Sequence, residues 1–498
     1  MLLKSKFVIN LIQMRTINHI IAGESIASVS VKTFLSENPA TEETIAEVAF
    51  GEAEDVNAAV ESADEAFQDW SRLAPAERGK LLYKVAEKLL EKREEFARAE
   101  TEDSGKTFQS NLNIDVPFCA DFWRYYAGAA DKLRTPVVAN EYGVQRYAVR
   151  EPYGVVGAIA PWNFPLVMAS LKMCAALACG NTIVMKMAEQ TPATVTMLAE
   201  LLLEVGFPKG VVNVVHGDGT TGQFLVNHPK VKKIAFTGSS KIGKLIATQC
   251  AEKTKPVLVE MGGKSANIVF ADADLDLAAN GVMQSGLGNN GQFCLAASRI
   301  LIEESIADEF VERLIEKAGK INLGDPFDAR TNCGPIISQK QFERVMSYVE
   351  IGKAEGAEIV TGGKKPKHLD KGYFLEPTIF TKMSPAMRIW REEIFGPVIG
   401  ITIFKTEDEA IQLANDSDYG LGAYFWAKDV DRVHRVAGAL DSGLVFVNMP
   451  SYMTPQMPAG IRGLSGTGQN FGMEALENYT KLKGIYINYS GKIFPWLT

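Results

Sequence analysis

Cys294 is the residue whose type and surroundings point most directly to covalent chemistry. It lies in the run GLGNNGQFCLAASRI (286–300), where glycines and amide residues precede it and apolar residues follow. A thiol in a glycine-rich turn can be reached by a substrate, and we expect a helix or strand to begin just after it. A helix N-terminus there would lower the pKa of the thiol. The alternative is a small buried side chain, as free cysteines usually are.

Two further polar residues stand where a nucleophile would need them. Glu260 ends the apolar run PVLVE and precedes two glycines, which makes it a candidate general base. Asn163 follows an apolar run in GAIAPWNFPL, and its amide is a candidate oxyanion donor. The alternatives are a solvated glutamate at the end of a strand and an asparagine that only shapes a turn.

Two stretches have the composition of nucleotide contacts. KKIAF leads into TGSSKIG, where Gly238 and Gly243 permit a turn that aims backbone N–H groups at an anion. The spacing differs from G-x-G-x-x-G, so an ordinary strand-to-helix turn is an equal alternative. IVMKMAEQTP places Lys186 and Glu189 just beyond a strand, where ribose hydroxyls or phosphates can bind; the other interpretation is two exposed charges.

Composition narrows the class of protein. The chain has 498 residues, enough for two or three domains, and a net charge of −8 that argues against nucleic acid or an anionic membrane as its main partner. The six cysteines contain no C-x-x-C pair, which predicts a reducing, cytoplasmic location. The five histidines lack the spacing of metal ligands, so we expect no metal and no histidine base. No apolar stretch reaches the ~18 residues of a membrane span.

Short apolar runs alternate with helical segments over 153–260. The predicted strands are VVGAIA, NTIVMK, VVNVV, KKIAF and PVLVE, and the predicted helices are PLVMASLKMCAALA, TPATVTMLAELLLEVG and SKIGKLIATQCAEK. This alternation predicts right-handed βαβ units and a parallel sheet. A second α/β stretch follows from about Lys264 to Leu464, and residues 56–105 are predicted to be helical.

Two segments far apart in the sequence alternate with a period of two residues, NEYGVQRYAVREP (140–152) and YTKLKGIYINYS (479–490). They suit an antiparallel ribbon that projects between subunits, so we expect a homodimer or homotetramer. The first 13 residues make a poor signal peptide and read as an N-terminal extension, with Met14 as an alternative start.

Six motifs in order, PWNFP, KMAEQTP, FTGSSKIG, EMGGKSANIVF, GQFC and EEIFGPV, resemble those of the NAD(P)-dependent aldehyde dehydrogenase superfamily over nearly the whole chain. The resemblance implies an α/β fold with a Rossmann-type parallel-sheet cofactor domain, an α/β catalytic domain and a β oligomerisation arm. The implied boundaries are 14–137 and 153–262 for the NAD-binding domain, 263–464 for the catalytic domain, and 138–152 and 479–491 for the arm.

By similarity, Cys294 attacks a small-molecule aldehyde and forms a thiohemiacetal, whose oxyanion is held by the amide of Asn163 and the backbone N–H of Cys294. Glu260 then activates the water that hydrolyses the thioester. Two alternatives remain. In a CoA-acylating enzyme CoA resolves the thioester, although such members tend to lack the residue corresponding to Glu260. A structural protein on the same fold should have lost the nucleophile or the base.

The resemblance also implies NAD as cofactor, with NADP disfavoured because the charge of Glu189 would repel a 2′-phosphate. Lys186 and Glu189 correspond to adenine-ribose contacts, Ser239 and Trp162 to pyrophosphate contacts, and Glu393 to a clamp on the nicotinamide ribose. The full set of implied cofactor residues is Ile159, Pro161, Trp162, Lys186, Glu189, Gly219, Phe236, Gly238, Ser239, Ile242, Glu393 and Phe395.

The implied substrate tunnel is lined by Phe122, Phe164, Met168, Leu171, Phe293 and Ala459. Leu171 and Ala459 stand where aromatic residues are frequent, so we expect a wide tunnel that suits a medium-sized or aromatic aldehyde better than a trimethylammonium one, which would want an aromatic cage. Asn470 replaces a second carboxylate of many members, which leaves Glu260 as the main base. Three further departures, Met187, Lys241 and Asn290, are expected to tune cofactor binding.

Overall fold

The apolar runs between residues 153 and 260 form the centre of an eight-stranded sheet in the computed structural model, which describes residues 14–491. From edge to edge the strands are β22 (Gly466–Thr467), β12 (Val257–Glu260), β11 (Val231–Thr237), β8 (Val155–Ala160), β9 (Thr182–Met187), β10 (Val212–Val214), β2 (His19–Ile21) and β3 (Glu24–Ile26). Strands β12 to β10 are parallel, and the outer three pair antiparallel. The chain order of the parallel strands reverses between β8 and β11, which is where Rossmann-type sheets bind dinucleotides.

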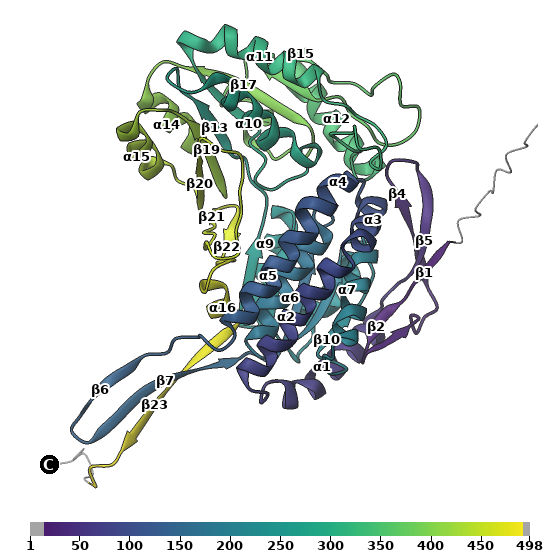
Figure 1. Cartoon of the computed structure of the whole chain (residues 1–498), viewed down its shortest axis with the longest axis vertical. Coiled ribbons are helices and arrows are strands. Elements are labelled where there is room, and N and C mark those ends of the chain that lie inside the picture. The colour runs from purple at the N-terminus through teal and green to yellow at the C-terminus, as the bar shows by residue number, and fades with distance from the viewer. Residues whose placement is uncertain (1–13, 492–498) are drawn as a thin grey trace, which may run out of the picture.

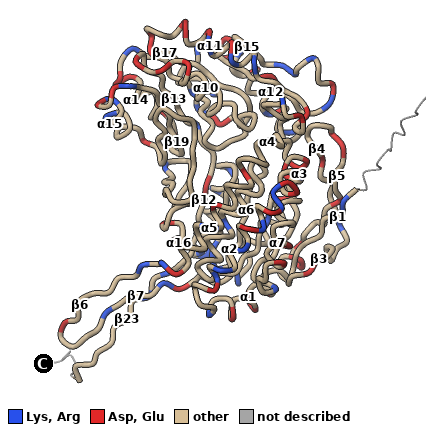
Figure 2. The backbone as a smooth tube through the Cα atoms, viewed as in Figure 1, with Lys and Arg blue, Asp and Glu red and all other residues tan. Residues whose placement is uncertain are grey.

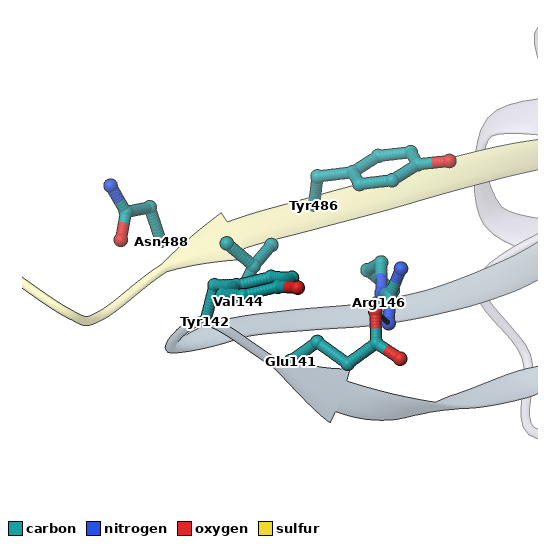
Figure 3. Close-up of a pocket in the computed structure, with 6 residues that line it drawn as sticks. All are labelled: Glu141, Tyr142, Val144, Arg146, Tyr486 and Asn488. Atoms are coloured by element: carbon teal, nitrogen blue, oxygen red, sulfur yellow. Dashed lines mark ion pairs between the residues drawn. The ribbon is translucent and has the colours of Figure 1, made fainter. Parts of the chain in front are cut away.

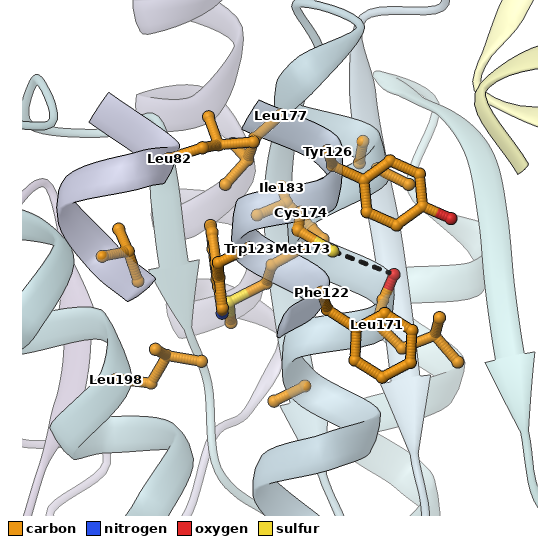
Figure 4. Close-up of a cluster of buried hydrophobic side chains, with 14 of the residues drawn as sticks. Leu82, Phe122, Trp123, Tyr126, Leu171, Met173, Cys174, Leu177, Ile183 and Leu198 are labelled. Carbon is orange, nitrogen blue, oxygen red and sulfur yellow. Dashed lines mark hydrogen bonds between the residues drawn. The ribbon is translucent and has the colours of Figure 1, made fainter. Parts of the chain in front are cut away.

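Helices cover both faces of this sheet (Figure 1). One face is packed by α2 (Pro75–Glu91), α5 (Val116–Ala129), α6 (Pro165–Ala178) and α7 (Ala193–Glu204), and the other by α1 (Ala53–Trp70), α8 (Gly219–Asn227) and α9 (Ser240–Glu252). Along β9, Ile183 and Met185 pack into the first core and Val184 into the second, as alternation along a strand requires. Figure 4 shows the first core, where Phe122 of α5 and Leu171 of α6 are both buried.

Residues 264–464 form a second body around a seven-stranded sheet. Its strands, in order, are β15 (Glu358–Thr361), β16 (Thr378–Thr381), β17 (Val398–Phe404), β14 (Arg299–Glu303), β13 (Ala266–Val269), β19 (Gly422–Trp426) and β20 (Leu444–Val447). All pairs are parallel except β15 with β16. Helices α10 (Leu275–Leu287) and α11 (Ala307–Gly319) cover one face; α12 (Gln339–Ala354), α13 (Arg388–Arg391), α14 (Glu407–Asn415) and α15 (Val430–Ala439) cover the other.

Smaller elements complete the two bodies. A three-stranded sheet of β1 (Arg15–Ile17), β5 (Glu43–Ala49) and β4 (Thr33–Asn38) lies beside α3 (Arg93–Ser104), which is followed by α4 (Phe108–Ser110) and the π-helix η1 (Asn111–Asp115). The 3-10 helix η3 (Glu304–Ile306) precedes α11, β18 (Tyr419–Gly420) pairs with β21 (Arg462–Gly463), and α16 (Glu474–Asn478) precedes the last strand. Lys and Arg are interspersed with Asp and Glu over both bodies (Figure 2).

A three-stranded arm projects from the first body (Figure 1). It consists of β6 (Val137–Glu141), β7 (Val144–Pro152) and β23 (Thr480–Asn488), and β23 pairs antiparallel with β7 along its whole length. The two segments with period-two alternation therefore lie side by side, although more than 300 positions separate paired residues such as Lys481 and Glu151. Within residues 14–491, no helix combines the length and the apolar character that a membrane crossing requires.

Two buried histidines, His19 in β2 and His216 just after the neighbouring strand β10, should make the protein sensitive to acid. The rings of His19 and His216 stack at 5.9 Å, the His216 backbone N–H donates to His19 Nδ1 at 3.1 Å, and His216 Nε2 bonds the Thr196 hydroxyl at 3.0 Å. Burial lowers the pKa of His216 from 6.5 to about 3 and also lowers the pKa of His19. Both are therefore neutral in the fold and must be protonated on unfolding at lower pH.

Because the folded pKa is depressed, the stabilisation is present above pH 6.5 and is lost as the pH falls from 6.5 towards about 3. We expect His216 alone to remove about 2 kcal/mol of unfolding free energy between pH 7 and pH 5. Urea titrations of His216→Gln should show a correspondingly smaller difference between these two pH values. The matched change at exposed His434 should leave the pH dependence unaltered; equal curves for all three proteins would contradict the assignment.

Candidate active site

Three segments bring the predicted catalytic residues together between the two bodies. Asn163 follows β8, and Glu260 is the last residue of β12, so both stand at the carboxyl edge of the first sheet. Cys294 belongs to the second body and lies between the 3-10 helix η2 (Gly288–Gly291) and β14. Asn163 Nδ2 donates to the carbonyl of Gln292 at 3.0 Å, and the charge of Glu260 reaches the Cys294 thiol.

The Cys294 thiol has a raised pKa, which corrects the expectation of an activated thiolate. A strand and not a helix follows the cysteine, so no helix dipole stabilises the negative charge. Burial, together with the charges of Glu260 and Glu393, raises the pKa of the thiol to about 12, against the lowering effect of the backbone N–H groups of Leu295 and Cys294. The thiol is therefore protonated at neutral pH and needs a base when it attacks.

Asn163 has the geometry of an oxyanion donor. Its side chain is buried, and one N–H of the amide is held by the carbonyl of Gln292 at 3.0 Å. A primary amide carries two N–H donors, so a second one remains for a ligand. The backbone N–H groups of Cys294 and Leu295 lie close enough to the sulfur to favour its thiolate, which places peptide donors beside the reacting atom. Two kinds of donor thus converge near Cys294.

Glu260, at the end of β12, is held in place by hydrogen bonds from the neighbouring strand β11 and the residue after it. The Thr237 hydroxyl donates to Glu260 Oε2 at 3.0 Å, and the Gly238 N–H donates to the Glu260 carbonyl at 3.0 Å. The two glycines that follow it are required by close approaches. A Cβ on Gly263 would lie 2.4 Å from the carbonyl oxygen of Cys294, and one on Gly262 would lie 2.0 Å from Glu393 Oε2. These glycines therefore let the chain after Glu260 pass directly against the turn that ends at Cys294 (residues 288–294, the nucleophile turn).

Glu393 and Phe395 face this junction from the second body. Gly263 N–H donates to Glu393 Oε1 at 3.0 Å, and burial raises the pKa of this carboxyl to about 7. Phe395 adopts a left-handed φ of 62°, and its ring packs edge-on against Trp162 at 5.3 Å. Gln341 on α12 donates to the Phe395 carbonyl at 2.9 Å and holds this strained backbone. Gln341 was not predictable from the sequence, because its contact joins two distant segments.

The predicted dinucleotide residues surround the reversal point of the first sheet, and the donor set fits such a ligand. Ser239 is the N-cap of α9, yet its hydroxyl makes no capping bond, so the helix N-terminus can take an anion. Lys186 is buried, with a pKa lowered by burial, and its Nζ lies 3.6 Å from exposed Glu189. Ile242 is 43% exposed, as an apolar contact for a base would be.

The remaining predicted cofactor residues lie in or next to β8, α8 and β11. Gly219 begins α8, Ile159 lies in β8, Pro161 follows β8, and Phe236 is buried, its ring 2.6 Å from where a Cβ on Gly238 would stand. The Phe236 ring therefore packs against the turn at Gly238. Phe224 on α8 and Leu245 on α9 are exposed apolar residues that the sequence analysis missed.

Three of the predicted tunnel residues, Phe164, Met168 and Phe293, are partly exposed and form an apolar wall beside Cys294. Phe293 and Phe164 pack edge-on at 5.4 Å. Phe122, Leu171 and Ala459 are buried in the first core, so the expectation that they line a wide tunnel finds no support in the structure. Met453, which the sequence analysis missed, packs against both this core and the cluster around Phe293 and Cys294.

Two residues that depart from the family motifs, Asn290 and Asn470, are buried. Asn290 is buried and donates to the Gly334 carbonyl at 3.0 Å, so it holds the nucleophile turn. The expectation that it tunes cofactor binding finds no support in these contacts. Asn470 is buried and its backbone pairs with Ala459. Among the described residues, neither Asn470 Nδ2 nor the Nζ of buried Lys172 has a hydrogen-bond partner, and burial lowers the pKa of Lys172 to about 8 against the charge of Glu260.

Comparisons with known proteins identify the family of the chain. The model of the aldehyde dehydrogenase family matches residues 26–485. Retinaldehyde dehydrogenase 3 of Mus musculus is 45% identical over 470 residues, which cover 93% of this chain and 91% of the relative. The NAD+ complex of betaine aldehyde dehydrogenase from Staphylococcus aureus has a TM-score of 0.95 at 40% identity and covers 97% of this chain and 96% of that one.

The NAD+ complex of an aldehyde dehydrogenase from Bacillus cereus has a TM-score of 0.94 at 43% identity and covers 95% of this chain and 97% of that one. Family model, relatives and solved structures thus each span nearly the whole chain. The chain belongs to the aldehyde dehydrogenase family.

Proposed function

We propose that Cys294, Asn163 and Glu260 are the catalytic residues of an aldehyde oxidation that ends in the free carboxylic acid. Oxidation of an aldehyde with NAD(P)+ follows from family membership. The observation that carries the residue roles is the junction itself, where a thiol, an amide donor and a carboxylate from three segments meet. A non-catalytic role on the same fold is disfavoured because all three groups are present.

Each step can be assigned to groups of this chain. Cys294 Sγ attacks the carbonyl carbon as Glu260 takes the thiol proton, and the resulting oxyanion is held by the Asn163 amide and the Cys294 N–H. Bound NAD+ would supply the hydride acceptor, and loss of the hydride would leave a thioester on Cys294. Glu260 releases the thiol proton to solvent, takes a proton from the attacking water and returns it to the departing sulfur, which restores the Cys294 thiol. Aldehyde, NAD+ and water thus give acid, NADH and a proton.

Water and not CoA is the acceptor we infer for the thioester. The support is Glu260, which the Thr237 hydroxyl and the Gly238 N–H fix beside the thiol. The test is a panel of aldehydes with NAD+ and no CoA, in which reduction of NAD+ and the acid product are both measured. Stoichiometric acid supports the proposal. Turnover that requires CoA would show the acylating alternative, and no turnover with any aldehyde would contradict enzymatic function.

The substrate proposal rests on the apolar wall of Phe164, Phe293 and Met168 beside the thiol. Relatives do not decide it, since one is a retinaldehyde and another a betaine aldehyde dehydrogenase. We expect a higher kcat/KM for benzaldehyde or hexanal than for betaine aldehyde, because Phe164 and Phe293 pack edge-on against each other in an apolar wall and do not form the aromatic cage that a trimethylammonium group would want. The reverse order would contradict this account of the tunnel.

NAD+ is the cofactor we infer, in line with the NAD+ complexes of two relatives. Glu189 is exposed beside buried Lys186, where its charge would face a 2′-phosphate. We expect Glu189→Gln to lower the KM for NADP+ by about tenfold, about 1.4 kcal/mol, with a smaller change for NAD+. Initial rates with both dinucleotides test this, and Glu24→Gln on the far strand β3 is the control. An unchanged NADP+ to NAD+ ratio would contradict the role.

The arm supports the proposal of a homodimer or homotetramer, and the proposal of a cytoplasmic location rests on the six cysteines without a C-x-x-C pair. Tyr142 and Tyr486 are 84% and 76% exposed. Figure 3 shows these two tyrosines around a hollow of about 390 Å³ near the tip, together with Val144 and the ion pair of Arg146 and Glu141. Such apolar exposure on a projecting sheet is typical of a subunit interface. Light scattering of the intact chain tests it, and a monomer would contradict it.

A further inference from the structure

The side chain of Gln292, two residues before Cys294, fastens the nucleophile turn to a separate segment of the second body. This segment, residues 333–337, is called the anchoring segment. Gln292 is 2% exposed. Its Oε1 accepts the backbone N–H of Ile337 at 2.9 Å, and its Nε2 donates to the carbonyl of Pro335 at 3.4 Å. Both ends of the amide are thus used inside the protein.

The backbone carbonyl of the same residue holds the oxyanion donor. It accepts one N–H of the Asn163 amide at 3.0 Å and the Asn289 amide at 3.2 Å. Asn289 Nδ2 also donates to the Asn163 carbonyl at 2.9 Å, so the two loops are tied in both directions. Because the two N–H bonds of an amide diverge at a fixed angle, the direction of this carbonyl decides where the second N–H of Asn163 points.

The turn that carries the Gln292 carbonyl needs contacts from other segments of the chain to keep its shape. Asn289, Asn290 and Gly291 all have left-handed φ values, 48°, 58° and 67°. For the two asparagines this conformation costs roughly 1 kcal/mol or more each. Asn290 provides a second attachment to the anchoring segment, since its Nδ2 donates to Gly334 O at 3.0 Å and the Cys333 thiol donates to its Oδ1 at 3.2 Å.

The anchoring segment is itself held in place by close backbone packing. A Cβ on Gly334 would lie 1.9 Å from the Gly105 carbonyl, and a Cβ on Gly105 would lie 2.5 Å from the ring of Pro335. The Ile336 N–H donates to the Tyr373 carbonyl at 2.9 Å. The nucleophile turn is therefore mounted on a segment with little room to shift.

We propose that Gln292 is a positioning residue that aims the Asn163 amide at the oxyanion formed on Cys294. Its side chain fixes the peptide to the anchoring segment, its carbonyl holds one N–H of Asn163, and the other N–H is left to donate to the oxyanion. This inference rests on the roles proposed for Cys294 and Asn163. Because Gln292 is buried and both ends of its amide are bonded inside the protein, it acts through Asn163.

The test is the rate of the first hydride transfer in single turnovers, measured for Gln292→Met in two backgrounds. In the otherwise native protein we expect this rate to fall by about 10 to 10²-fold, because a small misplacement of a donor has that effect. In the Asn163→Ala background the same change should cost less than about twofold, since the group through which Gln292 acts is gone. The KM for NAD+ should stay unchanged in all variants.

Two controls separate positioning from loss of structure. Gln292→Glu keeps the acceptor for Ile337 N–H and should recover part of the rate. Asn181→Ala removes another buried amide, which lies just before β9 at the amino edge of the first sheet and donates to Ala176 O and Tyr479 O. This change should lower the Tm with no change in the rate per titrated thiol.

Equal losses in both backgrounds, or no loss in the native one, would overturn the positioning role. Failure of the underlying function is distinguishable, because Cys294→Ala would then remain active.

Discussion

Replacing Cys294 by alanine should abolish aldehyde oxidation, with kcat at least about 10⁴-fold below that of the native chain. The side chain supplies the bond to the substrate, and no other group of the site can replace it. The Tm and the affinity for NAD+ should stay near native values, because the change removes a single sulfur atom from a side chain that is only half-buried. Steady-state NADH formation and a thermal melt measure the two effects.

Cys250 is the matched control for this change. It is buried at the end of α9, away from the junction, and Cys250→Ala should keep the native rate. Residual activity of Cys294→Ala above about a hundredth of the native value would contradict nucleophilic catalysis at this sulfur.

Replacing Glu260 by glutamine should slow turnover by about 10²–10⁴-fold, the usual contribution of a general base. The two chemical stages, thioester formation and thioester hydrolysis, should not be slowed by the same factor. The charge of Glu260 raises the pKa of the Cys294 thiol, so its removal also eases ionisation of the sulfur and partly offsets the loss of the base in the first stage. Thioester hydrolysis has no such offset and should become rate-limiting.

A burst of about one NADH per subunit, followed by a slow phase, is the expected result for Glu260→Gln. The amide can still accept the Thr237 hydroxyl, so the strand end should keep its shape. Hydroxylamine, a stronger nucleophile than water, should accelerate the slow phase because it needs no base. A slow phase that hydroxylamine leaves unchanged, or a native rate, would contradict the role of Glu260.

The architecture was predictable where hydrophobic periodicity is strong. The helix predicted over 165–178 is α6 with the same ends, and the run PVLVE ends in β12 with Glu260 at its last position. Alternating apolar runs also identified the parallel sheet, since strands buried on both faces read as continuous apolar segments. The candidate site followed from motif order and from strand ends, which a parallel sheet gathers on one edge.

The remainder of the site depends on contacts between distant segments. The left-handed turn at Asn289 and Asn290 is stabilised by residues more than 40 positions away, such as Gly334. The raised pKa of Cys294 results from burial and from two carboxylates on other segments, so local sequence suggested the opposite direction. Lys172 was overlooked because it sits within an apolar helix, although a lone charge in such a helix was a usable signal.

The most direct test of covalent catalysis at Cys294 is the mass of the Glu260→Gln protein, quenched in acid within the burst after mixing with NAD+ and benzaldehyde. We expect a gain of one benzoyl group per subunit, located on the peptide that contains Cys294 and removed by hydroxylamine. No adduct during an observed burst of NADH, or an adduct on any other residue, would contradict it.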